Sequence, residues 1–239
     1  MQYVISDIHG CRTAFRKALE VIDFSARDTL YVLGDAVDRG EDPIGVLQDM
    51  MVMDNVIPVL GNHEYMAVQV LSVFSREITE ESLAALKEED LTAYMHWTSD
   101  GGDVTLRQFA ALDAEEKEAV LEYLMEFSLY EEVSAGGREY ILVHAGLDNY
   151  SPYRPLEDYN VYELIFHNAD PERVYDTERY LVTGHTPTLL YGDERKGRIV
   201  EENMQIRVDC GCVFGGALGV YCLDNGRKFY ISRKGELLV

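Results

Sequence analysis

Five short polar motifs, each directly after an apolar stretch, contain the side chains of this sequence that are best suited to hold metal ions. The motifs are SDIHG, GDAVDRG, GNHE, LVHAG and TGHTP, beginning at residues 6, 34, 61, 142 and 183. Their candidate ligands are two carboxylates, one amide and three imidazoles: Asp7, His9, Asp35, Asn62, His144 and His185. For any one of these histidines, a hydrogen-bonded residue at a strand end is the more common explanation. Four of the six histidines of the chain, however, lie where a predicted strand ends: His9, His63, His144 and His185. That grouping favours a shared site.

The chemistry of this ligand set indicates two transition-metal ions. Mixed oxygen and nitrogen ligands suit Mn²⁺, Fe²⁺ or Zn²⁺ better than Ca²⁺, which prefers oxygen alone. Six ligands are too many for one ion if water must also bind, so we expect two ions bridged by one carboxylate. Such a pair can lower the pKa of a bridging water and so provide a nucleophile at neutral pH. The predicted cofactor is a pair of divalent ions, with Mn²⁺ first and iron (Fe²⁺ or Fe³⁺) or Zn²⁺ as alternatives.

The elements that precede the first three motifs predict a parallel sheet. The strand-like runs are YVIS, TLYVL and VIPVL, and the stretches between them, 11–22 and 42–53, have helical periodicity. Asp42 is placed to cap the second helix, and Pro43 suits its first position. Strands alternating with helices form parallel sheets with right-handed crossovers, whose ligand sites lie at the carboxyl ends of the strands. The polar motifs lie at those ends.

The remaining chain divides into an acidic, helical part and a second set of strands. Residues from about 75 to 133 are expected to be helical, with one helix beginning at Thr79 and another capped by Asp113 and Glu116. Strand-like runs return as YILV, YLVTG and IRVDCG, and a final hairpin is predicted to turn at Asn225-Gly226. Neither a linker nor a repeat interrupts the chain. We therefore expect one domain over residues 1–239, with an acidic helical insert at about 75–133.

Composition limits the choice of partners. The chain has 43 acidic and 21 basic residues and a formal net charge of −22, which repels nucleic-acid polymers and anionic membranes. A phosphate site would therefore need local positive charge from metal ions or arginines. The sequence has no apolar run of roughly 18 to 20 residues and no signal-like start, which predicts a cytoplasmic protein. The four cysteines do not have zinc-site spacing and are expected to be free thiols.

The five motifs, in this order, resemble the signature of the PPP-type metallophosphoesterases. That family includes the Ser/Thr protein phosphatases and the symmetrical diadenosine tetraphosphate hydrolases. The closing DCG at residues 209–211 is also similar to the family, and WTSDGGDVTL, residues 97–106, resembles a segment of bacterial members. The resemblance implies an α/β fold of four layers, in which two mixed β-sheets pack face to face and are flanked by helices.

The resemblance also implies a role for each motif residue. Asp7 and His9 would bind the first metal, Asp35 would bridge both ions, and the second metal would be completed by Asn62, His144 and His185. His63 would be the general acid that protonates the leaving oxygen, and Asp38 would orient it. Arg39 would hold phosphate oxygens, with Asn62 beside it. The family generally has a further phosphate-binding arginine, for which Arg173 is the first candidate here and Arg154 the second, although a surface role is at least as plausible for either.

Three functions are compatible with these residues. The first is a metal-dependent Ser/Thr protein phosphatase, acting on a phosphorylated protein, peptide or small molecule. The alternative is a symmetrical dinucleoside polyphosphate hydrolase, which would use the same centre on an anhydride. The third is a metal-binding regulatory module without catalysis, and the intact group of His63, Asp38 and Arg39 argues against it.

Overall fold

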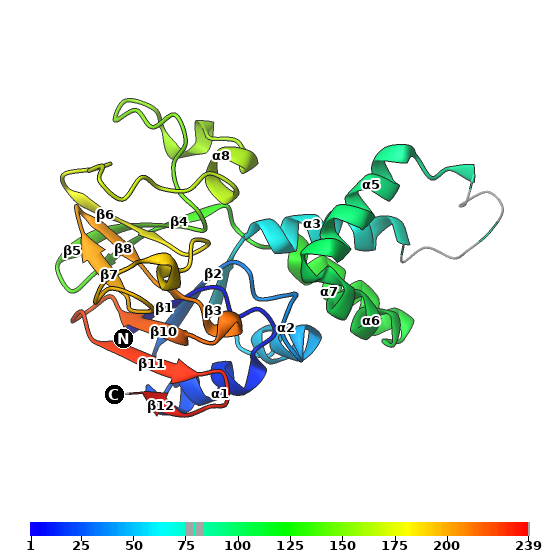
Figure 1. Ribbon diagram of the computed structural model, residues 1–239, viewed down its shortest axis with the longest axis horizontal. Coiled ribbons are helices and arrows are strands. Elements are labelled where there is room, and N and C mark those ends of the chain that lie inside the picture. The colour runs from blue at the N-terminus through cyan, green and yellow to red at the C-terminus, as the bar shows by residue number, and fades with distance from the viewer. Residues whose placement is uncertain (75–78, 80–83, 239) are drawn as a thin grey trace.

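Two mixed β-sheets form the centre of the protein (Figure 1), seen in a computed structural model that describes residues 1–74, 79 and 84–238. Six strands of the first sheet follow the order β12 (Leu237–Leu238), β11 (Lys228–Ser232), β10 (Ala217–Cys222), β1 (Gln2–Ile5), β2 (Thr29–Leu33) and β3 (Val56–Val59), and β9 (Asp209–Cys210) pairs with β10. The neighbours β1, β2 and β3 are parallel, as predicted. The predicted hairpin is confirmed, since β10 and β11 pair in antiparallel fashion around Asn225-Gly226.

The second sheet has five strands and carries the later motifs. Its order is β4 (Tyr130–Ala135), β5 (Arg138–Val143), β6 (Arg179–Thr183), β8 (Gln205–Arg207) and β7 (Val200–Glu202). The strands β5, β6 and β8 are parallel, whereas β4 and β7 run antiparallel to their neighbours. Both sheets are therefore mixed, in agreement with the predicted fold class.

Alternating side chains along the strands create four layers. In β1, Val4 packs into a core shared with the second sheet, whereas Tyr3 and Ile5 pack against the helices on the opposite face. In β5, Leu142 faces the shared core and Ile141 faces the helix α8 (Val161–Ile165). Because side chains alternate with a period of two, each strand supplies both an inner and an outer core. The result is helix, sheet, sheet, helix.

Helices α1 (Arg12–Val21) and α2 (Pro43–Met51) connect the parallel strands β1, β2 and β3. The side chain of Asp42 accepts a hydrogen bond from the backbone N–H of Gly45 at 3.1 Å, so the predicted cap of α2 is confirmed. Short turns complete the chain: a kinked turn η1 (Thr98–Gly102) and the 3₁₀ turns η2 (Leu156–Asp158), η3 (Thr188–Leu190) and η4 (Cys212–Phe214). None of the described helices is long and apolar enough to cross a membrane.

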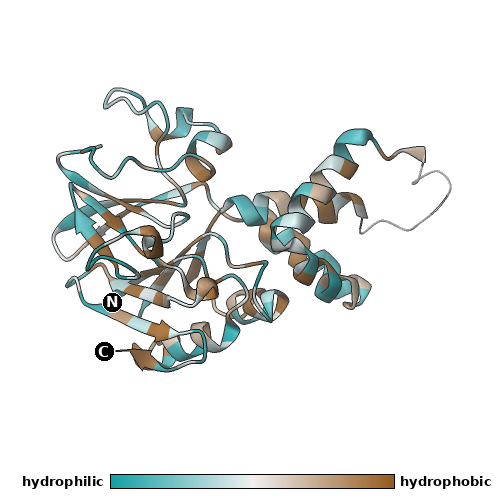
Figure 2. Cartoon of the chain, viewed as in Figure 1, coloured by the Kyte–Doolittle hydropathy of each residue, from teal (hydrophilic) through white to brown (hydrophobic). Residues whose placement is uncertain are grey.

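Four helices form an arm to one side of the sheets (Figure 1): α3 (Asn62–Phe74), α5 (Glu88–Trp97), α6 (Asp103–Ala110) and α7 (Ala114–Met125). Each has hydrophobic and hydrophilic surfaces (Figure 2), and buried Trp97, Phe109 and Leu124 join the same core as α1 and α2. The predicted capping box is present, because Asp113 and Glu116 exchange hydrogen bonds of 2.9 and 3.0 Å. Most of the first turn expected for the helix from Thr79 falls on residues 80–83, which lie outside the described part of the chain.

One boundary of the predicted helical insert is wrong. Residues 130–133 are not helical, because the strand β4 starts at Tyr130 and pairs with β5 along its whole length. Val133 and Ala135 are buried in the core between the sheets. The adjacent glutamates Glu131 and Glu132 lie on opposite faces of β4 and so interrupt the apolar alternation that Val133 and Ala135 continue.

Candidate active site

The five motifs meet where strands of both sheets end. Asp7 and His9 follow β1, Asp35 follows β2, and His144 and His185 follow β5 and β6. The third strand differs from expectation, because Asn62 is already the first residue of helix α3. All six predicted metal ligands lie in this one region, and all except His185 are buried.

The backbone at these strand ends is unusual. Six motif residues other than glycine have positive φ values between 43° and 69°: Asp7, His9, Asp35, Asp38, Arg39 and His185. Side chains with a Cβ atom rarely adopt this conformation, and such strain concentrates at functional sites. Gly34, with φ of 73°, meets a further constraint, because a Cβ atom there would lie 2.5 Å from the Cα atom of Gly61. The chain therefore turns sharply after these strands, and the turns direct the polar side chains of the motifs towards one another.

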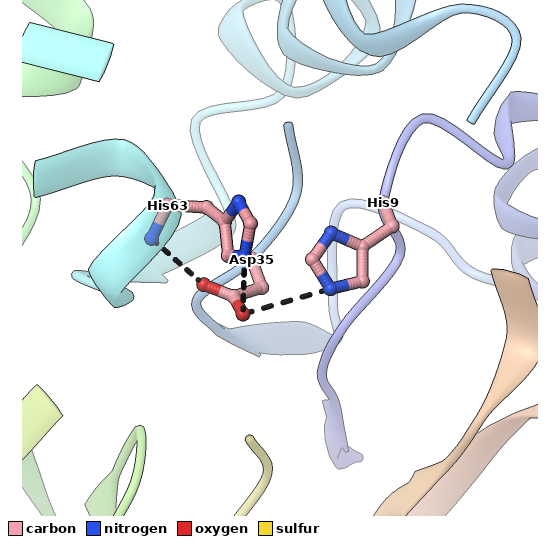
Figure 3. Close-up of side chains that lie close together, drawn as sticks. All are labelled: His9, Asp35 and His63. Carbon is pink, nitrogen blue, oxygen red and sulfur yellow. Dashed lines mark hydrogen bonds and ion pairs between the residues drawn. The ribbon is translucent and has the colours of Figure 1, made fainter. Parts of the chain in front are cut away.

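Asp35 lies at the centre of the cluster. Its Oδ2 atom is 3.6 Å from Nε2 of His9, and its Oδ1 atom is 3.4 Å from Nε2 of His144. Figure 3 shows the Asp35 carboxylate between the imidazoles of His9 and His63, and its Oδ1 atom also accepts a hydrogen bond of 3.1 Å from the backbone N–H of His63. Asp35 is the residue shared by the two groups of side chains that could each hold an ion, one with His9 and His63 and the other with His144 and His185. This is the place that a bridging carboxylate would need.

Backbone carbonyl groups orient two of the histidines. Nδ1 of His9 lies 2.9 Å from the carbonyl oxygen of Val37, and Nδ1 of His144 lies 2.7 Å from that of Leu33. Each Nδ1 therefore donates its proton to a carbonyl, which leaves the Nε2 lone pair directed towards the centre. Metal-binding histidines are commonly held in this way.

The second group of ligands consists of electron-pair donors that face one another. Nε2 of His144 is 2.9 Å from Oδ1 of Asn62 and 3.1 Å from Nδ1 of His185. Burial lowers the pKa of His144 well below its usual value and that of His185 to about 4, so both imidazoles are neutral at pH 7. Nε2 of His144 and Oδ1 of Asn62 both present lone pairs here, and Nδ1 of His185 adds a third in the tautomer with its proton on Nε2, so one divalent ion could bind all three. The residues present therefore fit a metal centre.

The carboxylates of the centre point to the same conclusion. Burial raises the pKa of Asp7 to about 6 and that of Asp35 well above its usual range. Burial likewise raises the pKa of Asp209, a carboxylate that the sequence marked only as part of the DCG motif. Three buried carboxylates in one place are costly unless positive charge compensates them.

His63 differs from the other three histidines. Its Nδ1 atom lies 2.6 Å from Oδ2 of Asp38, and its buried Nε2 atom has no hydrogen-bond partner among the described residues. Burial acts to lower its pKa, but the negative charges of Asp35 and Asp38 outweigh burial and raise it to about 9. His63 also lies close enough to Asp35 for the two side chains to bind the same ion. A protonated imidazole, however, has no lone pair to offer a metal. The geometry suits a proton donor that points at the centre.

The helical arm supplies partners for Asp38 that the sequence did not indicate. Oδ2 of Asp38 accepts a hydrogen bond of 2.7 Å from the indole N–H of Trp97, and Oδ1 accepts one of 2.5 Å from the hydroxyl of Thr105. Thr105 in turn accepts a hydrogen bond of 3.0 Å from the backbone N–H of Asp38. Asp38 is completely buried. The resemblance of residues 97–106 to bacterial family members was the only sequence signal for this contact.

Arg39 lies directly beside the centre. Its Nη1 atom is 2.7 Å from Nε2 of His9, and its Nη2 atom donates a hydrogen bond of 2.9 Å to Asp100 in the arm. The backbone N–H of Arg39 donates to the carbonyl of Gly101 at 3.0 Å. Gly101 has φ of 100°, and a Cβ atom there would lie 2.6 Å from Cγ of Arg39, so only glycine permits this approach. The guanidinium group is thus close enough to the predicted ligands to hold a phosphate.

Glu64 is a further residue whose role the sequence did not reveal. Its buried carboxylate accepts hydrogen bonds from the backbone N–H groups of Asp35, Ala36, Val37 and Gly61, at 2.7 to 3.1 Å. Glu64 thereby joins the loops that follow β2 and β3. Because Asp35 lies in one of these loops, Glu64 positions the central carboxylate through the backbone.

The two other candidate arginines are engaged elsewhere. Arg173 stacks on the rings of Tyr150 and Tyr175 and donates to the carbonyl of Tyr150 at 3.2 Å. Arg154 makes a bidentate ion pair with Glu163 at 2.7 and 2.8 Å. Among the described residues, the hydrogen bonds, ion pairs and ring contacts of these two arginines involve none of the predicted metal ligands. The second phosphate-binding arginine therefore stays a prediction, with both candidates held by other partners in the described structure.

Comparison with known proteins agrees with these observations. A family model described as calcineurin-like phosphoesterase matches residues 3–216. A protein from Nitrosomonas europaea, named symmetrical bis(5'-nucleosyl)-tetraphosphatase, is 32% identical over 246 residues, which cover 98% of this chain and 73% of the relative. A protein of the same name from Acidovorax sp. (strain JS42) is 28% identical over 216 residues, or 86% of this chain. The chain spans 65% of the length of that Acidovorax relative.

A solved structure has the same fold. It is a crystal structure of a candidate diadenosine tetraphosphatase, with a TM-score of 0.65 and 20% sequence identity over 96% of this chain and 92% of that chain. The ordered motifs, the two mixed sheets and the matching family model lead to one conclusion. The chain belongs to the calcineurin-like phosphoesterase family.

Proposed function

We propose that this protein hydrolyses phosphoanhydrides and phosphoesters with the help of two divalent metal ions. The observation that carries the proposal is that three features lie close together: the cluster of candidate ligands around Asp35, the candidate proton donor His63 and the guanidinium cation of Arg39. One ion would be held by Asp7 and His9. The other would be held by Asn62, His144 and His185, and Asp35 would bind both ions. When bound, the ions would supply an activated water and neutralise phosphate charge.

The side chains of the protein would perform the remaining tasks. Arg39 would hold the non-bridging oxygens of the attacked phosphate with its guanidinium fork, and Asn62 would lie beside them. As water adds to phosphorus and the bond to the bridging oxygen breaks, His63 would give its proton to the departing oxygen. Asp38 would keep the imidazole in the required orientation. The hydrogen bond between His63 and Asp38, with Arg39 close by against His9, supports an enzyme and not a module without catalysis.

For the substrate, we infer a dinucleoside polyphosphate that is cleaved symmetrically. The first prediction from the sequence, a Ser/Thr protein phosphatase, is not confirmed, because the relatives from Nitrosomonas and Acidovorax are named symmetrical tetraphosphatases. Their names support the alternative. In the reaction, water and a dinucleoside tetraphosphate would yield two nucleoside diphosphates, one carrying the oxygen of water and the other the proton from His63.

Product analysis on the metal-loaded protein tests this proposal. The protein is loaded in turn with Mn²⁺, Zn²⁺ or Fe²⁺ and given diadenosine tetraphosphate, a phosphothreonine peptide or p-nitrophenyl phosphate. We expect ADP as the only nucleotide product and a kcat/KM for the dinucleotide more than tenfold above that for the peptide. The opposite preference would return the assignment to a protein phosphatase, and a mixture of AMP and ATP would contradict symmetrical cleavage.

A further inference from the structure

A cavity of about 350 Å³ opens beside the predicted metal ligands, and one of its walls is apolar. The polar lining residues are Asp7, His9, Arg39, His185 and Asp209, and the apolar ones are Pro187, Leu189, Leu190 and Phe214. Pro187 ends the predicted site motif TGHTP and Leu189 and Leu190 follow it, whereas Phe214 follows the motif DCG. Small-molecule sites are typically about 300–1,000 Å³ in volume, so the cavity has room for part of a substrate.

The apolar wall is open to solvent although it lies next to charged groups. Phe214 is 58% exposed and Leu190 is 76% exposed. The turn η4 presents Phe214 between Gly211 and Gly215, both in the left-handed conformation. The guanidinium carbon of Arg39 lies 5.4 Å from the centre of the Phe214 ring. An aromatic face is therefore held within reach of the cation that would bind phosphate.

The position of the cavity indicates which part of a substrate it would receive. His63, which would protonate the leaving group, is absent from the described lining residues, and so is Asp100 beside it. The occupant would therefore belong to the half of the substrate that keeps the attacked phosphorus. A phosphomonoester has no second substituent on that phosphorus, so it would leave the cavity empty. A dinucleoside polyphosphate has one, which ends in a nucleobase.

Building on the proposed function, we propose that this cavity binds the nucleobase of the nucleotide half whose phosphorus is attacked. The base stacks on Phe214 and contacts Leu190, while its phosphates reach Arg39 and the metal centre. Stacking on an aromatic ring tolerates all bases, because every base has a π-face. Since the apolar wall offers no hydrogen-bonding side chain, adenine and guanine should be accepted to a similar extent.

Kinetics of Phe214 variants test the site. Phe214→Ala should lower kcat/KM for diadenosine tetraphosphate by about 5- to 100-fold, which corresponds to the loss of one base–aromatic stack. It should leave kcat/KM for p-nitrophenyl phosphate within about twofold of the wild-type value, because that substrate does not fill the cavity. Phe214→Trp should retain activity on both substrates. Tyr153→Ala removes an aromatic ring that is 93% exposed in another loop and serves as the matched control.

Equilibrium binding separates this inference from the proposed function. Calorimetry with the Mn²⁺-loaded protein should show that ADP, the product of symmetrical cleavage, binds at least tenfold more tightly than pyrophosphate, and that Phe214→Ala removes most of the difference. If ADP and pyrophosphate bind equally, or if Phe214→Ala weakens both ligands or both substrates alike, the base site is wrong. If ADP shows the expected advantage but diadenosine tetraphosphate is not hydrolysed, the base site stands and the proposed function fails.

Discussion

The indole nitrogen of Trp97 donates a hydrogen bond of 2.7 Å to Oδ2 of Asp38, the same oxygen that lies 2.6 Å from Nδ1 of His63. The helical arm is therefore part of the candidate active site and not only a cover for the core. Trp97 and Thr105 together hold the carboxylate of Asp38, which would orient the proposed proton donor His63. They do not contact the predicted metal ligands in any hydrogen bond of the described chain, so we regard them as positioning residues.

Trp97→Phe should lower kcat roughly tenfold, because a hydrogen bond to a charged group contributes about 1.5–3 kcal/mol and 1.4 kcal/mol corresponds to a tenfold change in rate. The loss should be larger for phenyl phosphate, whose leaving group needs a proton, than for p-nitrophenyl phosphate. Thr105→Val should behave similarly, whereas Thr105→Ser keeps the hydroxyl and should remain close to the wild type. Equal losses on both substrates would show that Trp97 acts only through stability.

His63→Asn should reduce kcat by about 10²- to 10⁴-fold, the usual contribution of a general acid. Metal content, measured by plasma mass spectrometry after gel filtration, should stay at the wild-type level, because His63 is not among the predicted ligands. His144→Asn is the comparison variant, and it should lose metal as well as activity. Loss of an ion from His63→Asn would identify this residue as a ligand instead.

Chelation should abolish turnover, and added Mn²⁺ or Zn²⁺ should raise the midpoint of thermal unfolding of the chelated protein. A ligand that binds the folded cluster and not the unfolded chain stabilises by mass action. Asp35→Asn should remove this response, since Asp35 is common to both candidate metal groups. Asp54→Asn, at an exposed position, is the control and should respond like the wild type. Full activity in a verified metal-free sample would contradict the two-metal proposal.

Glu64→Gln should destabilise the fold by about 1–3 kcal/mol, the cost of leaving a buried donor unsatisfied. A glutamine can accept hydrogen bonds with only one of the two atoms that replace the carboxylate oxygens, whereas the backbone donors approach both oxygens of Glu64. Urea unfolding measures the change, and metal content should fall with it because Asp35 is displaced. Glu118→Gln, on the exposed side of α7, should change neither quantity. A variant with wild-type stability would show that the four N–H groups do not require the carboxylate.

Asp49→Asn should destabilise the protein at pH 7 by about 1–3 kcal/mol. Burial opposes ionisation of Asp49, but hydrogen bonds from Arg12 at 2.7 and 2.8 Å and from Arg16 at 2.6 and 2.7 Å outweigh it and hold its pKa well below the usual value. Because the folded pKa is the lower one, this stabilisation is present above about pH 4 and is lost as the pH falls below that value.

The difference in unfolding free energy between the wild type and Asp49→Asn should therefore shrink as the pH is lowered from 5 towards 2.5. Urea titrations across that range measure it. Asp103→Asn tests an exposed ion pair with Arg107 at 3.3 Å, which should contribute little at any pH. A difference that does not vary with pH would show that the charge of Asp49 is not responsible.

The sequence alone predicted the parallel arrangement of the first three strands and the set of candidate ligands, and the resemblance of its motifs implied the class of fold. These features are local: a period-two apolar run, a helix between two such runs and a polar residue at the strand end suffice to place Asp7, His9 and Asp35 at one edge. The same reasoning failed for β4, whose glutamates concealed the alternation. It also overlooked that Asn62 begins a helix.

Tertiary structure decided which residues serve the centre from a distance. Trp97 and Thr105 bind Asp38 although they lie 59 and 67 residues away from it in the sequence, and no periodicity in the sequence predicts such a contact. Arg39 stands at the centre whereas Arg173 is held by tyrosines, although both are arginines in polar segments. The difference arises because the packing of the arm and loops against the sheets, and not residue type, fixes where each side chain can reach.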